Sequence, residues 1–378
     1  MVSRTAEHAE VIRRRLTSQF LTTPGPKTAS EVVRALGAVQ AQDYAGAKWA
    51  LGIRTRVETD ASIDRQVDSG KILRTHVLRP TWHFVSPGDI RWMLALTGPR
   101  VKQSMSYHGR TLEIDAKTVR KSHDAITSAL SDGRHLTRLE LAEALTRAGV
   151  KNATGQKLAH LVMEAELDAL IVNGARRGKQ STYALLDERV PASQPLPRDE
   201  ALHKLATIYF TTRGPATVKD FSWWSGLPMA DAKRAVEMVR GELAMRVVNG
   251  ENAWFDPGVT PKPAKGALLL PNYDEYFIGY KDRSAIGKRV NGTTAVTGGT
   301  ADLTHVAFID GELVGGWKRL MDKNGVVVAL ELSCELTRLE SGRIERVVDA
   351  LGEFLGAPVA IGEQADRRTG RHKSSRGT

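Results

Sequence analysis

The sequence is short of the residues on which disulfide, metal and membrane functions depend. It contains one cysteine, Cys334, so neither an intrachain disulfide nor a zinc site built from several cysteines can form. Its 10 histidines show no metal-ligand spacing. No segment reaches the roughly 18 apolar residues that a membrane-spanning helix needs, and the polar N-terminus lacks the apolar run of a signal peptide. We therefore expect a cytoplasmic protein without a metal centre.

The sequence also lacks the loops that bind nucleotides or activate a nucleophile. It has no Walker A loop, no Gly-x-Gly-x-x-Gly motif after a strand, no His-Glu-x-x-His motif and no nucleophile elbow. These absences disfavour a nucleotide-driven motor and a zinc enzyme. We expect no cofactor.

Positive charge, by contrast, is in excess. Lys and Arg number 54 against 43 acids, which gives a net charge of +11 and a pI of about 9.7. This balance suits a polyanionic partner, because neutralising phosphates dominates nucleic-acid affinity. A soluble protein that is merely basic is the alternative. The 378 residues suit two to three domains, and the 41% hydrophobic fraction is ordinary for a globular chain.

A helix start recurs along the chain. A threonine is followed three residues later by an acid at Thr28-Ala-Ser-Glu31, Thr137-Arg-Leu-Glu140 and Thr217-Val-Lys-Asp220. Such pairs cap the first turn of a helix reciprocally. After each one, a short break separates a first helical stretch from a second, which is the pattern of a helix-turn-helix. Three such units in a basic chain indicate nucleic acid as the partner.

The order of elements predicts an α+β, mostly helical protein with three tandem winged-helix units followed by a small C-terminal β-barrel. Paired strands follow the helices of each unit, and a proline-rich linker covers 191–197. Short β-rich segments occupy 264–335, before a closing helix at 340–355. The predicted segments are 1–86 for unit 1, 87–190 for a helical connection and unit 2, 191–263 for unit 3, 264–363 for the barrel and its helix, and 364–378 for a basic, structureless tail. The tail binds nucleic acid non-specifically or only aids solubility.

The first of the three breaks holds two glutamines, Gln40 and Gln42. On a regular helix their side chains point about 200° apart, whereas in a turn both can face one cavity. The break also precedes the second helix, which helix-turn-helix proteins direct at DNA. A Gln-x-Gln pair alone is more often a solvated turn or a helix cap.

Three blocks together carry a family resemblance: Gly37 to Arg54, Leu78 to Val85, and Leu270 to Arg283. In this order they resemble the bacterial winged-helix DNA glycosylases of the AlkZ and YcaQ type, and the resemblance covers essentially the whole chain. It implies three winged helices, a C-terminal β-barrel, and DNA held in a concave face. It also implies hydrolysis of the N-glycosidic bond of alkylated purines without a metal or nucleotide cofactor.

The resemblance places the catalytic signature of the AlkZ-like branch at Gln40-Ala41-Gln42, with the carboxylate of Asp43 next to it. An N7-alkylguanine is a cationic leaving group, and its departure leaves an oxocarbenium-like sugar that water must trap. We expect the two carboxamides to orient that water and to stabilise the sugar cation electrostatically. The expected partner is double-stranded DNA carrying alkylated purines, possible crosslinks included, and the expected protein is a monomeric, nucleoid-associated, monofunctional glycosylase.

Candidate DNA contacts come from basic residues near the pair and in predicted wings. The glycine-bracketed loop 174–180 offers Arg176, Arg177 and Lys179 as phosphate contacts. The other candidates are Lys48, Arg54, His83, Lys281 and Arg283. His83 has a second interpretation as a packed strand residue.

The segment 273–276 also has two interpretations. Asp274 and Glu275 form either an alternative catalytic carboxylate pair or a junction between unit 3 and the barrel. In the second case we expect them to pair with Lys281 and Arg283.

Two other functions compete with a glycosylase. A non-enzymatic winged-helix transcription regulator has the same DNA-binding module, although regulators usually read two-fold sites as dimers with one module each. A resistance protein that sequesters damaged DNA or drug without turnover is the third possibility. Base release separates the enzyme from both.

Overall fold

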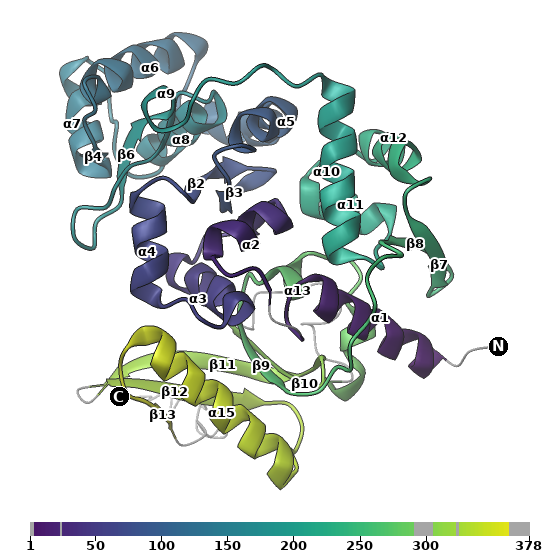
Figure 1. The fold of residues 1–378 in the computed structure, drawn as a ribbon. Coiled ribbons are helices and arrows are strands. Elements are labelled where there is room, and N and C mark those ends of the chain that lie inside the picture. Colours follow the sequence, from purple (N-terminus) through teal and green to yellow (C-terminus); the bar gives the residue numbers. More distant parts are fainter. Residues whose placement is uncertain (1–3, 23–24, 291–304, 323–324, 363–378) are drawn as a thin grey trace, which may run out of the picture.

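The computed structural model describes residues 4–22, 25–290, 305–322 and 325–362. This part is a mixed α/β structure in which helices make up nearly half of the chain. In Figure 1 the helical units lie above a C-terminal sheet, and the N-terminal helix runs between the two layers. The predicted tail at 364–378 lies outside the described residues.

The first helical unit combines four helices with a small sheet. Its elements are α1 (Arg4–Ser18), α2 (Ala29–Leu36), β1 (Ala38–Gln40), α3 (Tyr44–Thr55), α4 (Asp60–Asp68), β2 (Leu73–Val77) and β3 (Arg79–Val85). The strands are antiparallel in the order β1-β3-β2. The predicted hairpin is confirmed, whereas the sequence predicts neither β1 nor α4.

The next two units repeat helices followed by short strands. The second contains α5 (Ile90–Thr111), α6 (Ala116–Leu130), β4 (Leu136–Thr137), α7 (Arg138–Arg147), α8 (Gly155–Leu167), β5 (Ile171–Asn173), β6 (Thr182–Leu185) and α9 (Leu186–Arg189). The third contains α10 (Arg198–Arg213), α11 (Val218–Ser225), α12 (Met229–Val239), β7 (Ala244–Val248) and β8 (Glu251–Phe255). The three predicted capping boxes, at Thr28, Thr137 and Thr217, are all confirmed. The assignment of the units as winged helices stays a prediction.

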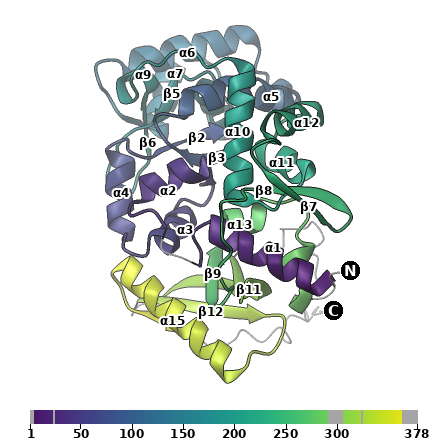
Figure 2. The same ribbon diagram turned by 45° about the vertical axis from the view of Figure 1, so that its right-hand side comes forward.

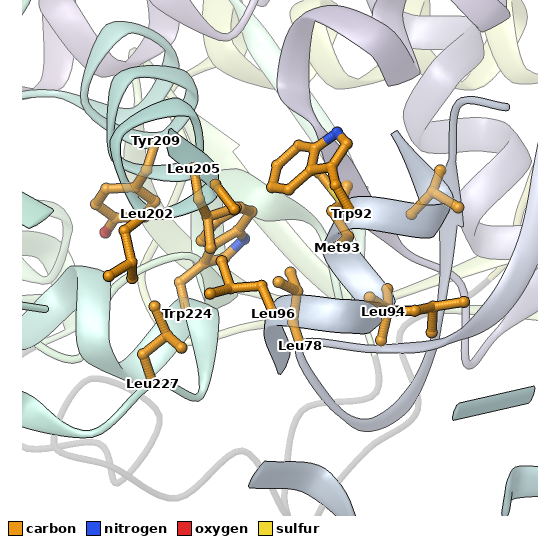
Figure 3. Packing of buried hydrophobic residues seen from close by; sticks show 14 of the residues in the cluster. Leu78, Trp92, Met93, Leu94, Leu96, Leu202, Leu205, Tyr209, Trp224 and Leu227 are labelled. Atoms are coloured by element: carbon orange, nitrogen blue, oxygen red, sulfur yellow. The ribbon is translucent and has the colours of Figure 1, made fainter. Parts of the chain in front are cut away.

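One hydrophobic core runs through all three units. Figure 3 shows Leu96 of α5 beside Leu205 of α10 and Trp224 of α11, and Leu94 and Leu202 belong to the same cluster. The same cluster also contains residues of β2 and of α8, and it extends to Tyr280 in the C-terminal region. The linker 191–197 therefore joins segments that share a core. The predicted domain boundaries stay a prediction.

The C-terminal region is a five-stranded sheet with one covering helix. Its strands have the order β13-β12-β11-β10-β9, and only the β12–β13 pair is parallel. Their bounds, with those of the helices, are β9 (Ala267–Pro271), α13 (Glu275–Ile278), β10 (His305–Ile309), β11 (Glu312–Asp322), β12 (Gly325–Leu332), α15 (Arg338–Leu355) and β13 (Val359–Ile361).

The small β-barrel or sheet predicted here is an open, curled half-barrel in the described part of the chain. Figure 2 shows α15 lying along the sheet. Its Ile344, Val348 and Phe354 pack in one core with Trp49 of α3 and Leu269 of β9. These helix side chains cover an apolar face that a closed barrel would bury within itself.

Candidate functional site

The glutamine pair spans the end of a strand and the bend that follows it, because Gln40 ends β1 and Gln42 lies between β1 and α3. Gln40 is the last residue of β1, where it is directly opposite His83 of β3. The pairing continues beyond β1, because the Ala41 N–H donates to the Trp82 carbonyl at 2.7 Å. The chain is therefore extended as far as residue 41, and residues two apart in extended chain point to the same side.

Both carboxamides contact neighbouring residues of β3. Gln40 Nε2 donates to Thr81 Oγ1 at 3.3 Å, and Gln42 Oε1 accepts the Trp82 N–H at 3.3 Å. Gln40 is 6% exposed, and its Oε1 has no hydrogen-bond partner in the described part of the chain. Gln42 is exposed to solvent. Gln40 is therefore a buried carboxamide whose oxygen can still accept a hydrogen bond, and Gln42 is a carboxamide that solvent can reach.

A buried ion pair holds the free edge of β1. The Glu275 carboxylate of α13 accepts the Gln40 N–H at 3.0 Å, and it also accepts from Arg213 Nη2 at 2.7 Å and Trp224 Nε1 at 2.8 Å. Arg213, at the end of α10, donates to the Ala38 carbonyl at 3.0 Å. The two side chains therefore satisfy the backbone groups of β1 that β3 does not reach. Glu275 and Arg213 are both fully buried.

A second buried carboxylate supports the strand from the side of unit 2. Glu166 of α8 contacts His76 Nδ1 through a short hydrogen bond, and its Oε1 accepts from Trp82 Nε1 at 3.4 Å. The His76 and Trp82 rings stack with centroids 4.4 Å apart. Arg74 lies over the same indole at 4.5 Å and donates to the Ala41 carbonyl at 3.0 Å. Trp82, whose N–H binds Gln42, is therefore fixed by groups from two units.

Asp43, the carboxylate beside the pair, caps a helix. Its Oδ1 accepts the Gly46 N–H at 3.1 Å at the start of α3. Glycine at position 46 allows close approach, since a Cβ there would lie 2.8 Å from the Pro271 side chain. Asp43 therefore orients α3 directly after Gln42.

His83 is a neutral, buried imidazole. Its Nδ1–H donates to the Thr81 carbonyl at 2.9 Å, while Nε2 has no partner in the part of the chain that the structure describes. Burial lowers the pKa of His83 well below its ordinary value, and the nearby charge of Arg79 acts in the same direction. The side chain is fully buried, which fits the packed strand residue and leaves no surface for a direct DNA contact.

Three other predicted DNA contacts are also buried in the structure. Lys48 pairs with Asp60 at 2.6 Å and Asp64 at 2.9 Å, and Arg54 pairs with Asp274 at 2.7 Å. Arg283 lies over the Phe277 ring at 4.6 Å. These three cations contact other groups of the protein, whereas the sequence analysis predicted that they contact DNA at the surface.

The remaining predicted contacts lie at or near the surface. Arg176 is partly buried and pairs with Asp64 at 2.8 Å and Asp68 at 2.9 Å. Arg177, Lys179 and Lys281 are exposed, and Arg177 also pairs with Glu140 at 2.8 Å. Lys179 and Lys281 are therefore the predicted contacts most available to a phosphate.

The segment 273–276 is a junction, as one of its two interpretations proposed, but with other partners. Asp274 pairs with Arg54 of α3, and Glu275 pairs with Arg213 of α10. The expected pairing with Lys281 and Arg283 is wrong, because α13 points both carboxylates back toward units 1 and 3. Glu275 belongs to the third block of the family resemblance, but no neighbouring residue in the sequence indicates that it contacts Arg213 or Gln40.

No group of three or more potential metal ligands occurs among the described residues. No helix in the described ranges is long and apolar enough to cross a membrane. Around Gln40 and Gln42 the structure places the Thr81 hydroxyl, the buried His83 imidazole, the Arg74 guanidinium and the carboxylates of Asp43 and Glu275.

Comparison with known proteins identifies relatives over most of the chain. A family model described as DNA glycosylase AlkZ-like matches residues 33–354. An interstrand DNA cross-link repair glycosylase from Streptomyces sahachiroi is 26% identical over 349 residues, which are 85% of this chain and 90% of that protein. The solved structure of Streptomyces sahachiroi DNA glycosylase AlkZ has a TM-score of 0.77 and 21% identity, over 94% of this chain and 99% of that chain. The structural likeness shows a shared fold.

Proposed function

The chain belongs to the AlkZ-like DNA glycosylase family, and from this premise we propose that it hydrolyses the N-glycosidic bond of N7-alkylated purines in duplex DNA. As a DNA glycosylase it is a hydrolase acting on N-glycosyl bonds. We extend the proposed substrates to bulky and crosslinked adducts, because the relative from Streptomyces sahachiroi is named for cross-link repair. We propose that the protein acts as a monomer at the nucleoid, in DNA repair or self-resistance.

The observation that carries this proposal is the position of the two carboxamides. Gln40 Oε1 has no partner in the described part of the protein, so it can accept a hydrogen bond from a water without losing another bond. Gln42 is accessible and is held by the Trp82 N–H. Together they orient the nucleophilic water and direct amide dipoles at the sugar as positive charge develops.

Neutral carboxamides are weak bases, so the substrate must supply a good leaving group. Alkylation at N7 supplies it, because the purine ring then carries a positive charge that is lost on departure. We therefore expect release of N7-alkylguanine and little or no release of unmodified guanine. Three winged helices around a concave face would hold the duplex, with Lys179 and Lys281 as phosphate contacts.

Base release under single-turnover conditions tests the proposal. The substrate is a duplex with one N7-methylguanine, and a second duplex carries a bulky N7 adduct. We expect Gln40→Ala and Gln42→Ala each to lower the rate by about a hundredfold or more, the usual effect of losing one preorganised polar group. DNA affinity should stay within about threefold of the wild type, because neither glutamine carries charge.

Gln103→Ala, an exposed glutamine on α5, is the matched control and should release base at the wild-type rate. Binding without release from either adduct would contradict the proposal and favour a regulator or a sequestering protein. Unchanged base release in a protein that carries both Gln40→Ala and Gln42→Ala would support glycosylase activity but place the catalytic site elsewhere in the protein.

A further inference from the structure

Arg79, the first residue of β3, has no partner for its charge among the residues that the structure describes. Its Nε and Nη2 atoms are buried and have no hydrogen-bond acceptor in the described part of the chain. It also forms none of the ion pairs found between described residues, although the other arginines near Gln40 are engaged. Arg79 as a whole is partly buried, but two of its three guanidinium nitrogens are out of water without an acceptor, which is costly, and such a group is usually retained for a ligand.

Arg79 lies close to the glutamine pair. Arg79 pairs with Val77 of β2 across an irregularity in the register, and His83 pairs with Thr75. Arg79 and His83 therefore lie on the same face of the sheet, and His83 is directly opposite Gln40. Thr81 binds the Gln40 carboxamide directly. The charge of Arg79 acts on His83, and the charges of Glu275 and Arg213 act on Arg79, so all four side chains lie in one neighbourhood.

The nearest carboxylate is already occupied. Glu275 accepts from the Gln40 N–H, from Arg213 and from Trp224, and it forms no hydrogen bond or ion pair with Arg79. The turn after α11 covers the stem of Arg79: a Cβ on Gly226 would lie 2.2 Å from the Leu78 carbonyl oxygen and 3.4 Å from Arg79 Cγ. The backbone of the arginine is thus fixed, while its Nε and Nη2 have no partner in the described ranges.

The two unpartnered atoms define the chemistry of the missing acceptor. Nε–H and one Nη2–H form the edge of a guanidinium that binds two oxygens of one planar or tetrahedral anion. Arg176 uses this edge for the two oxygens of Asp68, whereas Arg213 directs it at one oxygen of Glu275. Near a residue pair that acts on DNA, the anion that presents two such oxygens is a backbone phosphate.

We propose that Arg79 binds a phosphate of the DNA backbone next to the damaged nucleotide, turning its guanidinium outward when the duplex docks. The proposal rests on the proposed action on DNA and adds an anchoring site to it. The bound phosphate fixes the register of the lesion against Gln40 and Gln42, as phosphate contacts do in other DNA-binding proteins. It also supplies the counter-ion that Arg79 lacks in the free protein.

The test compares Arg79→Met with the wild type, because methionine keeps an apolar stem and removes the charge. We expect affinity for a duplex with one N7-methylguanine to fall about tenfold to a hundredfold, the usual range for a charged hydrogen bond. The slope of log affinity against log salt should become shallower by about 0.9, the value for one phosphate. Arg240→Met removes an exposed arginine paired with Glu237 and is the matched control. Its affinity for the same duplex should fall much less than that of Arg79→Met.

A second measurement separates a ligand role from a structural role. Removing an unpaired buried charge should leave the melting temperature unchanged or raise it, whereas removing a charge held by internal water should lower it. Lower stability together with wild-type affinity would overturn the proposal.

A duplex with neutral methylphosphonates beside the lesion locates the phosphate. Wild-type affinity should fall on this duplex, and Arg79→Met should bind it as it binds ordinary DNA. Independent, additive losses would contradict the pairing. Binding is measured apart from base release, so a wild type that releases no base would contradict the proposed function while leaving this pairing testable.

Discussion

At the residue scale, buried carboxylates determine where the two glutamines lie. Glu275 accepts the backbone N–H of Gln40, and Glu166 accepts the indole N–H of Trp82, whose own backbone binds Gln42. Neither acid has an accessible side chain that a substrate could reach. Each therefore acts through a glutamine, as a positioning residue.

Shortening Glu275 tests this role. In Glu275→Asp the carboxylate retracts by one methylene, so we expect β1 to shift and single-turnover base release to fall by about tenfold to a hundredfold, as misplacements of about 1 Å do. DNA affinity should change little, because Glu275 is fully buried. Leu145→Ala in unit 2, also fully buried, controls for lost stability: it should lower the melting temperature by a similar margin without slowing release. Equal rates in Glu275→Asp and the wild type would rule the role out.

His83 predicts a dependence of stability on pH. Burial lowers the pKa of its imidazole in the folded protein, whereas the unfolded chain titrates near 6.5. Stability from the neutral histidine is thus complete above about pH 6.5 and is lost as the pH falls below it. We expect the wild-type melting temperature to fall between pH 7 and pH 5, and His83→Gln to lose less over that interval. Parallel curves for the two proteins would count against a neutral buried His83.

At the element scale, α3 is fixed at both ends and along its length. Asp43 caps its first turn, Trp49 Nε1 donates to the Leu269 carbonyl at 2.7 Å, and Arg54 pairs with Asp274 in its last turn. The helix that follows Gln42 is thereby bound to the C-terminal sheet and its junction. This explains why Lys48 and Arg54, which look like a basic patch in the sequence, are engaged internally.

Arg54→Met separates the internal role from a DNA contact. Breaking a buried ion pair on one side leaves Asp274 uncompensated, so we expect the free energy of unfolding to fall by about 3–5 kcal/mol. The salt dependence of DNA binding should stay the same, because Arg54 is only 1% exposed. Chemical denaturation and a salt titration measure the two effects. If the slope of log affinity against log salt became shallower by about 0.9, Arg54 would be a phosphate contact after all.

Local signals in the sequence were enough for many elements and for the identity of the glutamines. Thr28 and Glu31 specify a helix start within four residues, and the hairpin before Val85 follows from alternation. The strand character of Gln40 could not be predicted in this way, because it depends on β3, Glu275 and Arg213, which are distant in sequence. The partner of Arg54 was missed for the same reason. The assignment of Gln40 and Gln42 as the site stays a prediction, and the groups that hold Gln40 in place were not predicted.

At the scale of the whole molecule, the predicted units share one interior. The core cluster that contains Ala38 of β1 also contains residues of α5, α8, α10 and α12, and it reaches Tyr280. The Arg213–Glu275 pair crosses the same boundaries between units. Folding of the strand that carries Gln40 is therefore coupled to folding of unit 3 and of the C-terminal junction.

This coupling predicts a single cooperative transition, although the linker 191–197 is exposed and rich in proline. Far-UV circular dichroism and tryptophan fluorescence should give coincident thermal curves, because all three units contribute residues to the shared cluster and none can unfold completely while it persists. A protease site placed in the linker should be cut without separating the fragments, since exposed loops tolerate insertion and the interface beneath is apolar. Two resolved transitions, or fragments that elute apart, would show that the units are independent domains and that Gln40 needs no support from unit 3.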